Sequence, residues 1–111
     1  MENKAEGDAV MYIVDSAVIV PEEKADEVIE IYNNRSRSVD SAKGFLSFQL
    51  LQNDRKPWEL TVHMEWDSKE SYLQWVRSDD FRRIHDLEKN YPDQQLADIV
   101  PKVTRYTVVA T

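Results

Sequence analysis

The chain has 111 residues, of which 41% are hydrophobic, and its formal net charge is −7. This length allows one domain with one core, and the negative charge argues against nucleic acids and anionic membranes as partners, because both require a cationic protein surface. The chain has no cysteine, which excludes disulfides, thiolate nucleophiles and zinc–thiolate sites.

The N-terminal segment is polar and of mixed charge, so we expect residues 1–8 to form a disordered tail and residues 9–111 to form a single domain. The segment lacks the basic start and apolar run of a signal peptide, and no apolar stretch is long enough to span a bilayer. We therefore expect a soluble, cytoplasmic protein.

The first half of the domain predicts a strand followed by a helix. Residues 9–20 are rich in Val and Ile at odd and even positions, which is typical of a strand buried on both faces. Pro21 suits the first turn of a helix, which we expect to end at Gly44. The predicted apolar or small face of this helix comprises Ala25, Val28, Ile29, Tyr32, Ser36 and Val39.

Two strands come next, over residues 45–52 and 58–66, joined by a polar connection of hairpin length. The second strand alternates, with Leu60, Val62, Met64 and Trp66 on one face and Glu59, Thr61, His63 and Glu65 on the other.

The remaining elements are helical except for a final strand. Asp67 followed by Glu70 resembles a capping box at the start of a helix, and Ser78 followed by two aspartates resembles a second N-cap. Residues 90–101 read as a loop with one short turn, and residues 102–110 as the last strand. The order β-α-β-β-α-β predicts a ferredoxin-like α+β sandwich. Its helices cover one face of the sheet, so we expect a second copy of the chain on the other face.

His85 has two interpretations. It is either a side chain that packs beside Phe81 one helical turn earlier, or an axial metal ligand or general base. No conventional set of metal ligands accompanies it, but heme brings four equatorial ligands of its own and needs only one protein imidazole. Trp75 is either a core residue or, if the chain turns back at Ser78, one wall of a site for a large planar ligand that also reaches His85.

Other polar residues also have two interpretations. Ser16 either bonds locally or supplies a polar group to an apolar pocket, and Asp15 points to the opposite face of the strand. The arginines are either solvated surface or carboxylate-binding residues at a pocket mouth: Arg35, Arg37, Arg82 and Arg83. There is no glycine-rich phosphate loop, and thus no evident flavin site.

Most of the chain resembles the antibiotic-biosynthesis-monooxygenase superfamily, and within it the IsdG-type heme-degrading monooxygenases. The resemblance is carried by "GFLSFQLL" and "MEWDSKESYLQWVRSDDFRRIH", which contain a Trp-Ser-Tyr-Trp-Ser-Phe-His pattern that heme-degrading and other members share. It implies a homodimer whose two sheets form one α/β barrel, with a pocket between the helices and the sheet of each subunit.

The same resemblance assigns roles to residues. His85 falls at the position of the iron ligand, Trp75 at that of the tryptophan that presses on the porphyrin, and Arg35 near the heme propionates. Ser16 stands where the heme-degrading members have an asparagine that donates a hydrogen bond near the distal side of the iron. A serine also donates, but from a shorter side chain.

Three functions follow from these observations. The first is an oxygen-dependent heme monooxygenase that opens the porphyrin and releases iron, with heme as substrate and cofactor and electrons from an unidentified external reductase. The second is a cofactor-free monooxygenase acting on an aromatic polyketide or quinol, with His85 or an inward-facing His63 as base. The third is a non-catalytic heme-binding protein.

Overall fold

The computed structural model of the protein describes residues 10–89 and 93–111. The predicted tail, and residues 90–92 of the predicted loop, lie outside these ranges. The secondary structure elements, in chain order, are β1 (Tyr12–Ile19), the 3-10 turn η2 (Glu22–Lys24), α1 (Ala25–Asn33), the 3-10 turn η3 (Ser38–Ser41), β2 (Phe45–Gln52), β3 (Glu59–Trp66), α2 (Lys69–Val76), α3 (Asp79–Lys89), α4 (Gln94–Ala97) and β4 (Lys102–Thr107).

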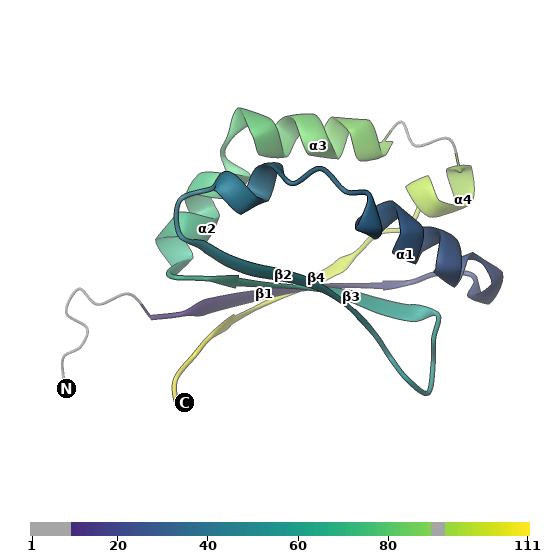
Figure 1. The fold of residues 1–111 in the computed structure, drawn as a ribbon, viewed down its shortest axis with the longest axis horizontal. Coiled ribbons are helices and arrows are strands. Elements are labelled where there is room, and N and C mark those ends of the chain that lie inside the picture. Colours follow the sequence, from purple (N-terminus) through teal and green to yellow (C-terminus); the bar gives the residue numbers. More distant parts are fainter. Residues whose placement is uncertain (1–9, 90–92) are drawn as a thin grey trace.

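The four strands form one antiparallel sheet in the order β2-β3-β1-β4. The helices lie together on one face of this sheet (Figure 1). The predicted ferredoxin-like α+β fold is therefore confirmed. The sheet of a single chain remains open and is not closed into a barrel, so the barrel stays a prediction about two copies.

The core lies between the sheet and the helices. The predicted alternation of β3 is confirmed, because Leu60 and Trp66 are completely buried on the helix side. Trp66 packs with Tyr12, Val14 and Trp75 in one apolar cluster, whereas Leu60 belongs to a second cluster beneath α1.

β1 differs from the prediction of a strand buried on both faces. Tyr12 and Val14 are buried on the helix side, but Ala17 and Ile19 are exposed on the other. The strand itself was predicted correctly from the Val/Ile-rich sequence. Its second face is not covered by any element of the described residues (Figure 1).

The predicted long first helix is wrong in its extent. Regular α-helix ends at Asn33, and a 3-10 turn later in the chain supplies the buried Val39. Asparagine is a weak helix former, and the Asn34 side chain donates hydrogen bonds to the Glu30 carbonyl at 3.0 Å and carboxylate at 2.9 Å, which caps the end. Gly44 does not stop a helix; it adopts φ = 83° just before β2.

The start of α2 is displaced by one residue from the predicted capping box. The N-cap is Ser68, whose hydroxyl accepts a hydrogen bond from the Ser71 amide at 3.1 Å. Asp67 instead accepts a hydrogen bond from the Ser71 hydroxyl at 2.7 Å. The polar residues from Asp67 to Glu70 therefore predicted where the helix starts, but not which side chain caps it.

None of the helices in the two described ranges is long and apolar enough to cross a membrane.

Candidate functional site

The corner between α2 and α3 is set by Ser78. Its hydroxyl accepts a hydrogen bond from the Phe81 amide at 3.1 Å, as predicted for an N-cap, and donates to the Trp75 carbonyl at 2.6 Å. One side chain thus ends the first helix and begins the second. The turn that we predicted at this position is confirmed.

Three rings follow one another across this corner. The Trp75 indole meets the Phe81 ring edge-on, with 6.0 Å between centroids, and the Phe81 ring lies 4.1 Å from the His85 imidazole. The predicted packing of His85 beside Phe81 is confirmed. Trp75 is buried and His85 is exposed, so the row runs from the core to the surface of α3.

Phe81 is a residue that the sequence analysis did not assign to the site. It contacts both Trp75 and His85, so a planar ligand that reaches both of these side chains must also border Phe81. The four-residue spacing to His85, one helical turn, is the sequence signal that could have included it.

Ser16 lies on the helix-side face of the sheet in an apolar setting. It pairs with Val62 in β3 and Val103 in β4, and Val14 and Val18 are its neighbours on the same face of β1. The side chain is half-buried, and its hydroxyl makes no hydrogen bond to another residue of the described ranges. A half-buried hydroxyl among valines is suited to a polar contact with a ligand.

Asp15, as predicted, lies on the opposite face, and there it joins His63. The Asp15 carboxylate is 2.7 Å from Nδ1 of His63, and the Glu65 carboxylate is 3.2 Å from Nε2. Burial lowers the pKa of His63, but the hydrogen bonds and charges of the two carboxylates outweigh it and raise the pKa above 6.5. Because the His63 side chain lies with Asp15 on the open face, it does not face the helix-side pocket. This removes His63 as the base in the cofactor-free alternative.

Arg35 is engaged within the fold. Its guanidinium donates to Asp40 and to the Ser36 carbonyl, both at 3.2 Å, and stands 3.8 Å above the centre of the Phe48 ring. Arg37 also pairs with Asp40, at 3.3 Å.

The two arginines of α3 are exposed and pair with the aspartates one turn earlier, Arg82 with Asp79 and Arg83 with Asp80. This agrees with their interpretation as solvated surface.

Tyr72 and Arg105 form a second feature that the sequence analysis did not identify. The Tyr72 ring packs against Tyr12 and Trp66, and the Arg105 guanidinium lies 5.9 Å from its centre. Burial raises the pKa of Tyr72, while the charge of Arg105 and a hydrogen bond from it oppose the rise. The period-two alternation of β4 was the available signal, because it places Val103, Arg105 and Thr107 on one face.

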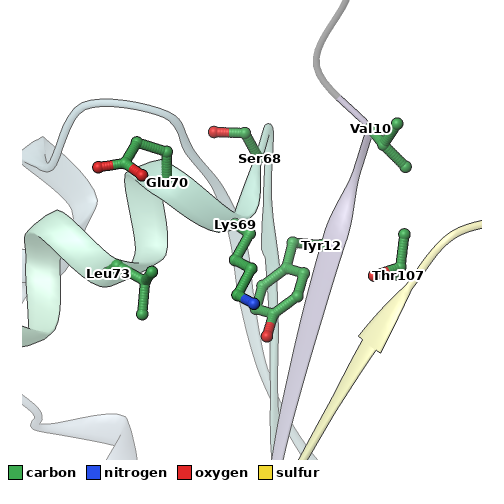
Figure 2. Close-up of a pocket in the computed structure, with 7 residues that line it drawn as sticks. All are labelled: Val10, Tyr12, Ser68, Lys69, Glu70, Leu73 and Thr107. Carbon is green, nitrogen blue, oxygen red and sulfur yellow. The ribbon is translucent and has the colours of Figure 1, made fainter. Parts of the chain in front are cut away.

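Two open cavities border α2. The larger, of about 550 Å³, lies between the start of α2, the beginning of β1 and the end of β4 (Figure 2). Its lining residues are Val10, Tyr12, Ser68, Lys69, Glu70, Leu73 and Thr107. The smaller, of about 230 Å³, is bordered by Trp75 and Ser78 on its helical side. Ser16 and His85 line neither cavity, so the structure does not bring the three predicted site residues around one of them.

Within the described ranges, no three His, Asp or Glu side chains are grouped so that they could hold a metal ion. A metal ion on the helix-side face would thus need most of its ligands from a cofactor such as a porphyrin, with one imidazole from the protein.

The sequence places the chain in a known protein family. Residues 11–87 match the antibiotic biosynthesis monooxygenase family, and the chain belongs to this family.

Named relatives share moderate identity with it. A heme-degrading monooxygenase of Listeria welshimeri is 28% identical over 94 residues, covering 77% of this chain and 78% of the relative. A heme-degrading monooxygenase of Bacillus mycoides is 28% identical over 100 residues, covering 88% and 90%. The family and these names support a monooxygenase function.

Solved structures agree on the fold. The heme-degrader MhuD of Mycobacterium tuberculosis, solved with two hemes bound in its active site, superimposes with a TM-score of 0.71 at 21% identity, covering 90% of this chain and 97% of that one.

Proposed function

We propose that the protein is a heme-degrading monooxygenase that uses heme as both substrate and cofactor. The observation that carries the proposal is the 28% identity, over most of both chains, to relatives named for this activity. The sequence has no glycine-rich phosphate loop that would indicate a flavin site, so we expect electrons to come from an external reductase, which is unidentified.

In this proposal, residues on the helix side of the sheet hold and orient the heme. His85 presents an exposed imidazole on α3, and as a neutral ring it would hold the iron. Trp75 would press on the macrocycle from the corner between α2 and α3, where its indole packs against Phe81 and Phe81 against His85. The Ser16 hydroxyl, among valines, would donate a hydrogen bond toward the distal side of the iron. Bound heme would supply the redox-active iron at which dioxygen reacts; the chain supplies binding, orientation and the hydrogen-bond donor.

The functional unit that we propose is a homodimer. The open face of the sheet carries exposed apolar side chains, since Ile19 is 67%, Tyr106 50% and Leu51 44% exposed. A second sheet packed there would bury these groups, on the order of 1,500 Å² in total. Analytical ultracentrifugation tests this: a folded monomer at micromolar concentration would contradict the dimer.

Hemin titration tests the heme assignment. We expect an absorbance band to form with the wild type and to be lost in His85→Ala, with circular dichroism unchanged. Binding should weaken as pH falls, because an imidazolium has no lone pair for a metal. His63→Ala is the matched control, since His63 lies on the other face of the sheet, and it should keep the band. Loss of the band in His63→Ala but not in His85→Ala would refute the ligand assignment.

One observation favours a second candidate, a cofactor-free monooxygenase on an aromatic polyketide or quinol. The cavity of about 550 Å³ is bordered by Val10, Tyr12 and Leu73 as well as by polar side chains, and His85 does not border it. A protein that binds no hemin would leave this candidate in place. A protein that binds hemin but does not consume it with a reductant would instead be a non-catalytic heme-binding protein.

A further inference from the structure

The helix-side face of β4 carries an exposed row of side chains. Val103, Arg105 and Thr107 pair with Ser16, Val14 and Tyr12 of β1, and all three are exposed. β4 is an edge strand of the sheet. A ligand above Ser16 would therefore meet β4 next.

Arg105 is the cation of this row. Ser16 pairs with Val103, so Arg105 is its diagonal neighbour on the same face, at about 7–8 Å between the backbones. An arginine side chain spans a separation of this size, so its guanidinium and the Ser16 hydroxyl can touch the same ligand.

Arg105 donates a hydrogen bond to Tyr72, and because a guanidinium has five N–H donors, others remain for an anion. Its neighbour is the Tyr72 ring, 5.9 Å away, and no ion pair joins it to a carboxylate of the described ranges. Burial keeps the pKa of Tyr72 above its usual value, so the phenol is neutral at physiological pH and does not neutralise the arginine. Arg35, by contrast, is bonded to Asp40 and stacked on Phe48.

We propose that Arg105 binds a carboxylate of the ligand held on the helix-side face, and that Tyr72 positions its guanidinium. The inference rests on the proposed function, in which the ligand is heme, a planar macrocycle with two propionate groups. A carboxylate suits the planar guanidinium, which donates two parallel hydrogen bonds to it. Arg105, rather than Arg35, is then the specificity-determining cation of the site.

The test compares hemin with hemin dimethyl ester, in which both carboxylates are esterified, using full-length protein and absorbance titration. Arg105→Met should weaken hemin binding about tenfold and leave binding of the ester unchanged, because the partly exposed ion pair exists only with the free acid. Arg105→Lys should recover part of the loss, since an ammonium keeps the charge but not the fork. Tyr72→Phe should give a smaller loss, again confined to hemin.

Arg55→Met, a charge change in the exposed β2–β3 connection, is the matched control and should bind both ligands as the wild type does. Equal weakening of hemin and ester by Arg105→Met would assign it a packing role and overturn the inference, as would no effect on either ligand. If Arg35→Met weakens the binding of hemin but not of the ester, while Arg105→Met changes neither, the carboxylate-binding role belongs to Arg35. If wild type binds neither hemin nor ester, the proposed function itself fails.

Discussion

The stability of the protein should depend on pH through His63. Its imidazole lies between the Asp15 and Glu65 carboxylates on the open face of the sheet, at 2.7 and 3.2 Å. Both bonds require an N–H, so both exist only when the ring is an imidazolium. A neutral ring carries one N–H and leaves the other nitrogen facing a carboxylate oxygen with no proton between them.

Whether stability rises or falls with pH follows from the direction of the pKa shift of His63. The pKa of folded His63 is raised above the ordinary value of 6.5, since the two carboxylates outweigh the effect of burial. A raised pKa means that the stabilisation is complete below pH 6.5 and is lost as pH rises through the pKa of the folded protein. The free energy of unfolding should therefore fall as pH rises above about 6.5.

The size of the effect follows from the exposure of the groups. A hydrogen bond between charged groups contributes about 1.5–3 kcal/mol when it is buried. Here the imidazole is 18% exposed and Asp15 29% exposed, so the lower end applies to that pair. Glu65 is 35% exposed and its bond is longer, so we expect only a few tenths of a kcal/mol from it, roughly as for a surface pair. The total, about 1–2 kcal/mol, corresponds to a fall in Tm of roughly 4–10 °C for a domain of this size.

The assay is thermal unfolding by circular dichroism at half-unit steps of pH from 5.5 to 8.5, for wild type and His63→Gln. Wild type should lose stability across this range, and His63→Gln should show a flatter profile because an amide does not titrate. His85→Gln is the matched control: it removes the other histidine and should keep the wild-type slope. Parallel profiles for wild type and His63→Gln would refute the assignment.

Three further predictions concern turnover and folding. Ser16→Asn should speed reductant-driven loss of the heme absorbance band and Ser16→Ala should slow it, with hemin affinity little changed. The full value of such a donor is about 3 kcal/mol, and equal decay rates would deny the residue a role. Gly44→Ala should destabilise the fold by about 2–4 kcal/mol in urea unfolding, since a Cβ at φ = 83° would overlap the Ser71 and Asp67 side chains. Ser78→Ala should cost about 1 kcal/mol in the same assay through loss of the α3 cap, and no change would show that the corner holds without it.

The fold was largely predictable because its strands follow simple periods. The alternation of β3 assigns Leu60 and Trp66 to the core without any knowledge of what lies above them. The first helix was overestimated because apolar spacing continues to Val39 through a segment whose asparagines and serines favour local side-chain bonds over helix. Periodicity indicates which face a residue occupies; it does not indicate whether the backbone between two such residues stays helical.

The site was predictable only in part, because its contacts join elements far apart in the chain. The local step from Phe81 to His85 lies within one helix and was predicted from spacing. The ion cluster on the open face depends on the register that sets Asp15 opposite His63, and the contact between Tyr72 and Arg105 depends on how α2 sits above β4. The alternation of β4 indicates which face Arg105 occupies, but no short stretch of sequence indicates that Asp15 meets His63 or that Tyr72 meets Arg105.

The two faces of β1 separate two kinds of chemistry that are adjacent in sequence. Ser16 points toward the helices and Asp15 toward the open face, since successive side chains of a strand alternate. A ligand that contacts Ser16 thereby lies on the other side of the sheet from the Asp15 carboxylate. The pH dependence that His63 confers on stability then acts on the fold and on any assembly through the open face. The proposed iron binding on the helix side would instead need the lone pair of the His85 imidazole. Single substitutions of the two histidines, which lie on opposite sides of the sheet, would therefore separate an effect on stability from an effect on heme binding.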